Sequence, residues 1–185
     1  ETISSDMVIR GFLKRKDTKR CPASREEKYF LPVNIYEEKV KGVRFSVKNV
    51  VKEVLSWHVD YPYLYELILE LTDAKGTIKD TYSATFGFRT VEFKADGFYL
   101  NGKKLKIRGL NRHQSYPYVG YAMPESMQKQ DADILKFELG CNAVRTSHYP
   151  QSHHFINRCD EIGLLVFMEI PGWQHIGDDA WKKQA

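Results

Sequence analysis

The first half of the chain alternates apolar and polar positions with a period of two. Five runs between about Thr2 and Phe98 show this pattern: MVIRGFLK, YFLPVNIY, VRFSVKNV, YLYELILELT and TIKDTYSATFGFR. Each run is rich in β-branched and aromatic residues, so each predicts a β-strand. The stretch Asp73–Gly76 predicts a hairpin loop with Gly76 in the left-handed conformation. Short strands at this spacing predict an immunoglobulin-like β-sandwich over residues 1–97.

The second half changes to strands that alternate with helices. Three short runs predict strands: KIRGLN at 106–111, NAVRT at 142–146 and LLVFME at 164–169, of which only the last is apolar almost throughout. Residues 125–139 and 152–162, between these runs, predict helices because their apolar residues recur with a helical period. The stripes are Met127, Ile134 and Leu135 in the first helix, and Phe155, Ile156, Cys159 and Ile162 in the second. Pro124 suits the first turn of a helix, and Gly140 and Gly163 suit positions just past helix ends.

The order strand, helix, strand, helix, strand predicts a parallel α/β architecture over residues 98–185. A complete (β/α)8 barrel typically needs about 250 residues. If this series belongs to a barrel, it is an incomplete (β/α)8 TIM barrel, of which the chain contains only the first two βα units and the third strand. The predicted fold class is multi-domain, with a β domain followed by the N-terminal part of an α/β domain.

Composition narrows the function only slightly. Aromatic residues make up 13% of the chain, which favours surfaces that bind flat groups such as sugar rings. The net charge is +4, and acidic residues interrupt the basic stretch between Arg10 and Lys28, so nucleic-acid binding is not expected.

No apolar run in the sequence is long enough to span a membrane. Cys141 and Cys159 lie in apolar surroundings typical of buried thiols. The chain begins at Glu1 and reads as a piece of a longer protein, so its compartment, bacterial cytoplasm or periplasm, stays open.

Polar residues gather where each predicted parallel strand ends. The three segments are Arg112–Pro117, Arg145–Pro150 and Glu169–His175, and each carries a histidine and a proline. Chemistry collects beyond the carboxyl ends of strands in parallel α/β folds. Imidazole and guanidinium groups suit the hydroxyls of a sugar, and a tryptophan face suits its C–H surface. Three histidines on a metal ion are the competing interpretation, although their wide spacing is unlike that of a zinc hydrolase. A Ser147 triad is not expected, since no GxSxG motif surrounds that serine.

Several long segments resemble a known family. They are WHVDYPYLYELILEL (57–71), FGFRTVEF (86–93), FYLNGKKLKIRGLNRHQSYP (98–117), CNAVRTSHYP (141–150) and CDEIGLLVFMEIPGW (159–173). On these segments the chain resembles glycoside hydrolase family 2, most closely its β-galactosidase branch. The resemblance implies a sugar-binding jelly roll, an immunoglobulin-like domain and a catalytic barrel in the parent enzyme. It also implies retaining hydrolysis of β-glycosides by two glutamates.

The resemblance places those two glutamates after the fourth and seventh barrel strands, so we expect no catalytic acid or nucleophile in this chain. The chain alone is expected to be inactive. Asp160 and Glu161 lie late in a predicted helix, away from the strand ends. Glu169 lies at a strand end, and we expect it to orient neighbouring groups. No second carboxylate stands at a neighbouring strand end to form a catalytic pair.

What the chain is expected to contribute is the rim that binds substrate. By resemblance, His113 and His148 contact sugar hydroxyls, and Arg145 lies against the nucleophile and keeps it ionised. Some relatives bind magnesium through a glutamate and a histidine two residues later. Here His175 matches that histidine, but Trp173 stands in place of the glutamate, so the sequence predicts neither this magnesium site nor another cofactor. Trp173 is instead a candidate stacking wall for the sugar. Asn111, Glu169 and His175 are expected to support these groups.

The predicted function is therefore a fragment of a retaining hydrolase of β-galactosides or related β-glycosides. Its expected partner is a carbohydrate substrate, and a homo-oligomer of the parent enzyme is left open. Three alternatives remain. The first is a non-catalytic carbohydrate-binding or scaffold module, and the second is β-glucuronidase activity in the parent. The third is a small metal enzyme that uses His113, His148 and His175.

Overall fold

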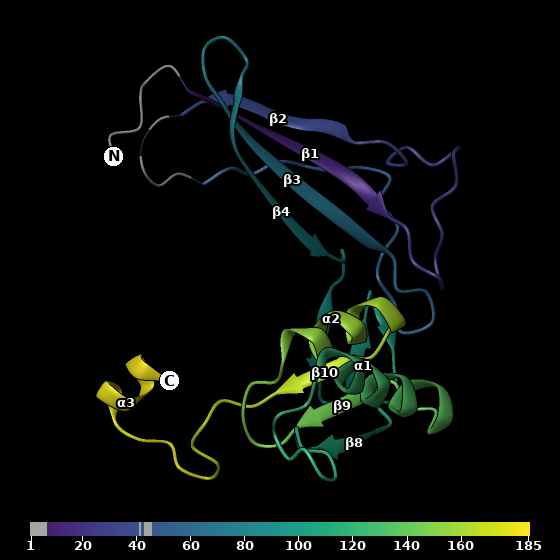
Figure 1. Cartoon of the computed structure of the whole chain (residues 1–185). Helices are drawn as coiled ribbons and strands as arrows, with labels where there is room; N and C mark the ends of the chain where they lie inside the picture. Colours follow the sequence, from purple (N-terminus) through teal and green to yellow (C-terminus); the bar gives the residue numbers. More distant parts are fainter. Residues whose placement is uncertain (1–6, 41, 43–45) are drawn as a thin grey trace. The chain divides into compact units, whose positions relative to one another are not determined.

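The computed structural model describes residues 7–40, 42 and 46–185. The chain divides into two compact units (Figure 1). Unit 1 comprises Glu1–Trp57 and Tyr63–Phe88, and unit 2 comprises His58–Pro62 and Arg89–Ala185. A β unit followed by the beginning of a barrel was predicted, and this architecture is confirmed.

The described part of unit 1 contains one four-stranded antiparallel sheet in the order β2-β1-β3-β4. The strands are β1 (Val8–Lys16), β2 (Val33–Lys39), β3 (Leu64–Thr72) and β4 (Ile78–Phe86). The predicted hairpin loop between β3 and β4 is confirmed, because Gly76 has a φ of +82°. The Asp73 carboxylate holds this turn by accepting hydrogen bonds of 2.9 Å from the backbone N–H groups of Lys75 and Thr77.

The third predicted strand, VRFSVKNV at residues 43–50, is wrong where it can be checked. Residues 43–45 lie outside the described residues, and residues 46–50 form no strand. Asn49 gives the physical reason. Its side-chain amide donates to the Ile35 carbonyl, and its side-chain oxygen accepts from the Val50 N–H at 2.7 Å. These side-chain bonds, one to the adjacent Val50 and one to Ile35 of β2, take the place of the backbone ladder that a strand would need.

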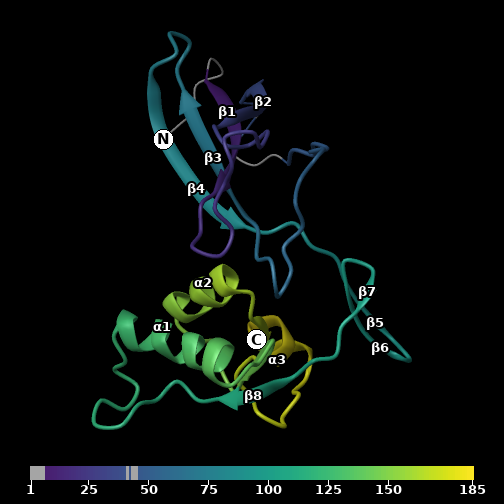
Figure 2. The ribbon, with the colours of Figure 1, turned by 90° about the vertical axis from the view of Figure 1, so that its right-hand side faces the viewer.

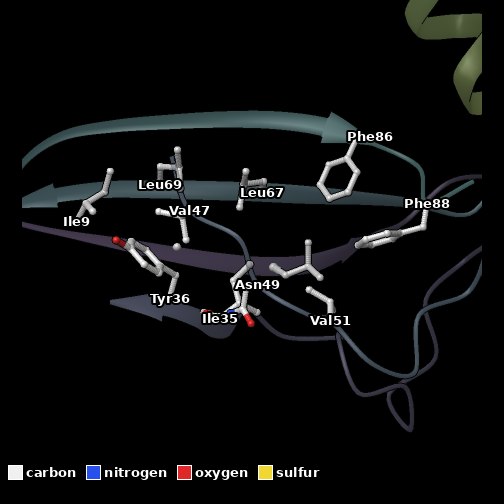
Figure 3. A pocket seen from close by; sticks show the side chains of 12 residues that line it. Ile9, Ile35, Tyr36, Val47, Asn49, Val51, Leu67, Leu69, Phe86 and Phe88 are labelled. Carbon is white, nitrogen blue, oxygen red and sulfur yellow. Dashed lines mark hydrogen bonds between the residues drawn. The ribbon is translucent and has the colours of Figure 1, made fainter. Parts of the chain in front are cut away.

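An apolar hollow of about 660 Å³ lies on one face of this sheet. Figure 3 shows its lining, in which Leu67 and Leu69 of β3 and Phe86 at the end of β4 face the same space as Val47 and Val51. The twelve lining residues include no carboxylate, histidine or cationic side chain. The hollow therefore belongs to the hydrophobic packing of unit 1, and its lining offers no group for acid–base chemistry.

Unit 2 is built on three parallel strands in the order β10-β9-β8. These are β8 (Gly109–Arg112), β9 (Ala143–Thr146) and β10 (Leu165–Met168). The helical segments α1 (Glu125–Asp133), η1 (Ile134–Glu138, a π-helix) and α2 (His153–Ile162) connect them. Figure 2 shows α1 and α2 side by side above β8. The predicted βαβαβ series is confirmed.

The second predicted helix is confirmed in detail. Phe155, Cys159 and Ile162 are buried along one stripe of α2, and they pack with Val144 of β9 in the core of unit 2. Gly163 ends the helix with a φ of +80°. A β-carbon at this position would lie 2.2 Å from the backbone oxygen of Val59, so the site excludes any larger residue.

The first predicted helix is correct in position but its buried stripe was partly wrong. Met127 is only half-buried, whereas Gln128 and Ala132 are buried together with Leu135. Gln128 was overlooked because glutamine is normally exposed. It is buried here because its side-chain oxygen accepts a 2.8 Å hydrogen bond from Arg112.

A small meander precedes the parallel strands and was not predicted. It consists of β5 (Val91–Lys94), β6 (Gly97–Leu100) and β7 (Lys103–Lys104). The expected domain boundary between residues 97 and 98 falls inside β6, whereas the two compact units divide between Phe88 and Arg89. Phe93 and Phe98 from this meander lie 6.5 and 6.3 Å, between ring centroids, from Phe167 of β10. A short helix, α3 (Asp179–Gln184), ends the chain. Within the described ranges, no helix has the length and apolar character needed to cross a bilayer.

Candidate active site

The register of the parallel sheet aligns Asn111 of β8, Arg145 of β9 and Phe167 of β10 in one row. Val144 packs into the helical core, so its neighbour Arg145 projects from the opposite face of the sheet. There the Arg145 guanidinium donates a 3.4 Å hydrogen bond to the side-chain oxygen of Asn111. Asn111 and Arg145 therefore form a polar row on the face of the sheet away from the helices, beside the apolar ring of Phe167.

Glu169, the first residue after β10, connects the polar groups of two strand ends. One carboxylate oxygen forms an ion pair with Nε of Arg145, and the other lies 2.9 Å from Nδ1 of His148. The hydrogen bond with His148 and the nearby positive charge of Arg145 hold the pKa of the Glu169 carboxyl below its ordinary value. Both oxygens of Glu169 are thus engaged, and the carboxylate is kept in its charged form.

Aromatic and imidazole rings surround this ion pair. The His148 ring stacks on the indole of Trp173 with centroids 5.0 Å apart and planes at 28°. The His113 ring meets His148 edge-on at 5.4 Å. Trp173 is 76% exposed, so the rest of its surface is open to solvent. The expected rim residues from three different loops are therefore neighbours in the fold.

A hollow of about 570 Å³ opens beside these groups. Its lining includes Arg145, Glu169, Trp173, His175 and Trp181. The hollow thus combines a cationic group, a carboxylate and two indole rings. Such a mixture suits a ligand with both hydroxyl groups and an apolar face.

His175 does not join the other two histidines. Its ring packs edge-on against Trp181 of α3, with centroids 5.6 Å apart, whereas Trp173, two residues earlier, turns towards His148. Across the described part of the chain, no three His, Cys, Asp or Glu side chains converge as metal ligands. The three-histidine metal site considered above is not formed. The donors around Trp173 and His175 do not fit the magnesium site of some relatives either, because a hard cation needs oxygen ligands.

One important residue was missed from the sequence. Arg112, the last residue of β8, is only 6% exposed and lies between Asn111 and His113. Its guanidinium pairs with Asp131 at 2.9 Å and also binds the side-chain oxygens of Gln128 and Gln151. It sits 3.9 Å above the ring of Phe155. These contacts tie the end of β8 to α1 and α2, and they fix the backbone from which Asn111 and His113 project.

The remaining acidic candidates lie elsewhere. Asp160 and Glu161 are in the second half of α2, and Glu161 pairs with Arg158 at 3.2 Å. Arg158 also holds Asp133 of α1. This pairing joins two helices on the side of the sheet away from Arg145, so it contributes to packing of the helices.

Comparison with known proteins decides the family. A family model described as "Glycosyl hydrolases family 2, TIM barrel domain" matches residues 91–182. A second model, described as "Glycosyl hydrolases family 2", matches residues 12–89. The chain belongs to glycosyl hydrolase family 2. A family 2 barrel also explains why the polar row lies at the carboxyl ends of parallel strands, where barrel enzymes place their chemistry.

Individual relatives agree with this family. The chain is 57% identical over 161 residues to a β-galactosidase of Thermoanaerobacterium thermosulfurigenes. The matched region covers 86% of this chain and 22% of that protein. It is 57% identical over 152 residues to a β-galactosidase of Thermoanaerobacter pseudethanolicus, covering 79% of this chain and 20% of the relative. Among solved structures, a β-glucuronidase of Parabacteroides merdae superimposes with a TM-score of 0.74 at 30% identity, covering 98% of this chain and 21% of that one. The chain thus spans about a fifth of the length of the family 2 relatives that it matches.

Proposed function

We propose that this chain supplies part of the substrate-binding rim of a retaining β-galactoside hydrolase. The observation that carries the proposal is the connected set of Arg145, Glu169 and His148, with Trp173 stacked beside it at the ends of parallel strands. The high identity to two β-galactosidases supports galactosides as the substrate class.

Each group has a proposed role. His113 and His148 offer ring nitrogens to sugar hydroxyls, and the exposed indole of Trp173 stacks on the C–H face of the sugar. Glu169 is a positioning residue: since Arg145 and His148 occupy both of its oxygens, neither oxygen is available for attack or for protonating a leaving group. The proposed role of Arg145 is to lie against a catalytic carboxylate from another strand and favour its charged form, which is supported by its half-exposed guanidinium beside Glu169.

The two catalytic glutamates of a retaining mechanism stand about 5 Å apart and act as nucleophile and acid. In this proposal they come from barrel strands other than β8, β9 and β10. The 185-residue chain by itself is therefore expected to release no nitrophenol from nitrophenyl β-galactoside.

A segment exchange tests the proposal. The matched 161 residues of the T. thermosulfurigenes β-galactosidase are replaced by the residues of this chain. We expect the exchanged enzyme to keep galactosidase activity, and His148→Ala or Trp173→Ala within the segment to reduce kcat/KM by at least roughly tenfold. Lys129→Ala on the exposed face of α1 serves as the control that leaves activity unchanged. A well-folded exchanged enzyme that hydrolyses nitrophenyl β-glucuronide and not the galactoside would contradict the proposal and favour the β-glucuronidase alternative, to which the structural similarity points.

A further inference from the structure

Hydrogen bonds through two side chains join the loop that follows β8 to the loop that follows β9. The backbone N–H of Gln114 donates to the hydroxyl of Tyr149 at 3.2 Å, and the side-chain oxygen of Gln114 accepts from the Ser152 N–H at 2.7 Å. The first of these loops carries His113 and the second carries His148. The bonds therefore fix the position of one histidine loop relative to the other.

Gln114 completes the cap of α2 from outside that helix. Ser152 is the N-cap residue of α2. In a capping box, a glutamine or glutamate at the third helical position accepts from the N–H of the N-cap residue. In α2 this position holds Phe155, which is buried in the core of unit 2 and offers no side-chain acceptor. Gln114 supplies the acceptor instead, which ties its loop to the first turn of α2.

The Tyr149 side chain packs against His113, with ring centroids 6.4 Å apart. Tyr121 meets the Tyr149 ring edge-on at 6.3 Å. The buried side chain of Gln151 donates to the Tyr149 carbonyl at 3.2 Å. The backbone, the ring and the hydroxyl of Tyr149 are thus each held by a contact, so the ring is a fixed surface beside the imidazole.

His113 depends on this support more than His148 does. The His148 ring is bonded to Glu169 and stacked on Trp173. In the part of the chain that the structure describes, the His113 ring contacts the rings of His148 and Tyr149 and makes no hydrogen bond. Its nitrogens are therefore left for a ligand, and its direction is set by the backbone of its loop and by the neighbouring rings.

We infer that Gln114 and Tyr149 are positioning residues for His113. Gln114 fixes the backbone directly after His113 through its bonds to Tyr149 and Ser152, and the Tyr149 ring limits rotation of the imidazole. The pair keeps the nitrogens of His113 in one direction before a sugar binds, which lowers the entropic cost of binding. The inference rests on the proposed function, which provides the contact between His113 and a sugar hydroxyl.

NMR on the 185-residue chain with labelled histidine tests the positioning directly. In a carbon–proton correlation spectrum, the Hε1 signal of each of the six histidines reports on the surroundings of its ring, and His113→Ala assigns the signal of interest. Gln114→Met removes the acceptor and keeps a side chain of similar length, so the His113 signal should shift and broaden. The signal of His175, which packs against Trp181, should stay in place. Gln114→Glu retains an acceptor at a helix N-terminus, where a carboxylate is favoured, and should restore the original His113 signal.

The segment-exchanged β-galactosidase tests the consequence for activity. With nitrophenyl β-galactoside as substrate, Gln114→Met should lower kcat/KM by roughly three- to tenfold, as expected for the loss of one neutral hydrogen bond. Gln114→Glu should recover most of this loss. In a His113→Ala background, Gln114→Met should have no further effect, because its action passes through His113. Gln130→Met, the same exchange at an exposed position of α1, is the matched control that leaves kcat/KM unchanged.

The outcomes separate this inference from the proposed function. An unmoved His113 signal in Gln114→Met refutes the inference, and so does a loss of kcat/KM that is equally large in the His113→Ala background. If Gln114→Met loses the folded spectrum, the milder Tyr149→Phe, which removes only the hydroxyl, decides by the same signal. If His113→Ala leaves kcat/KM unchanged, the proposed contact with the sugar fails, whereas the His113 signal still decides whether Gln114 and Tyr149 position this ring.

Discussion

Because the guanidinium of Arg112 is buried, we expect loss of the Asp131 charge to lower the free energy of unfolding of unit 2 markedly. Arg112 is almost fully buried, and among the described residues Asp131 supplies the only carboxylate that is paired with it. Asp131→Asn keeps the shape of the side chain and removes its charge. The guanidinium would then remain buried without an opposite charge.

The size of the effect follows from burial. Removing one partner of a buried ion pair typically costs about 3–5 kcal/mol. The Asp131 side chain is 20% exposed, so water reduces the effect towards the lower end, about 3 kcal/mol. For a unit of this size, that loss lowers the melting midpoint by roughly 10–20 °C. The bonds from Gln128 and Gln151 to Arg112 do not offset it, because a neutral amide supplies no charge.

Fluorotryptophan labelling gives an assay with an internal reference. Trp57 reports on unit 1, and Trp173 and Trp181 report on unit 2, so urea unfolding followed by fluorine NMR separates the two. Asp131→Asn should shift only the unit 2 signals. Asp133→Asn, which breaks the more exposed pair with Arg158 across the same helices, should cost less than about 1 kcal/mol.

A double-mutant cycle completes the test. In an Arg112→Met background the buried charge is gone, so adding Asp131→Asn should cost less than about 1 kcal/mol. If Asp131→Asn is no more destabilising than Asp133→Asn, or if its cost persists without Arg112, the buried charge is not what couples β8 to α1.

Two further predictions concern unit 2. Gly163→Ala forces alanine to a φ of +80° and drives its β-carbon onto the Val59 oxygen, so it should cost clearly more than the roughly 1–2 kcal/mol of backbone strain alone. Gly140→Ala, at a φ of +64° in open space, should show the backbone cost only, and equal losses in urea unfolding would contradict the steric argument. Because the hydrogen bond with His148 lowers the pKa of Glu169 in the folded state, its contribution is present above the unfolded pKa of about 4.3 and is lost as pH falls through the lower folded pKa. In the Glu169→Gln variant, the free energy of unfolding of unit 2 should therefore decrease less between about pH 5 and pH 3 than in the unchanged chain. An equal decrease in both proteins, measured by urea unfolding at each pH, would refute this.

Much of the fold could be predicted because periodicity reflects burial directly. The stripe of Phe155, Cys159 and Ile162 was readable since every member is apolar and faces one core. Gln128 was not readable, because its burial depends on Arg112, which is distant in sequence. The absent strand at residues 46–50 was unpredictable for a similar reason: the Asn49 side chain competes for backbone bonds only once β2 is beside it.

The sequence by itself determined the strand and helix order of the βαβαβ series, the family and the identity of the polar residues at the three strand ends. These depend on local propensity, on short-range periodicity and on motifs that are contiguous in the chain. Only the tertiary structure decided which of those residues meet. Parallel register set Arg145 beside Asn111, and the turns after β9 and β10 brought His148 to Glu169 and Trp173 while directing His175 to Trp181. Contacts between distant loops follow from the geometry of the whole sheet, which no local pattern encodes.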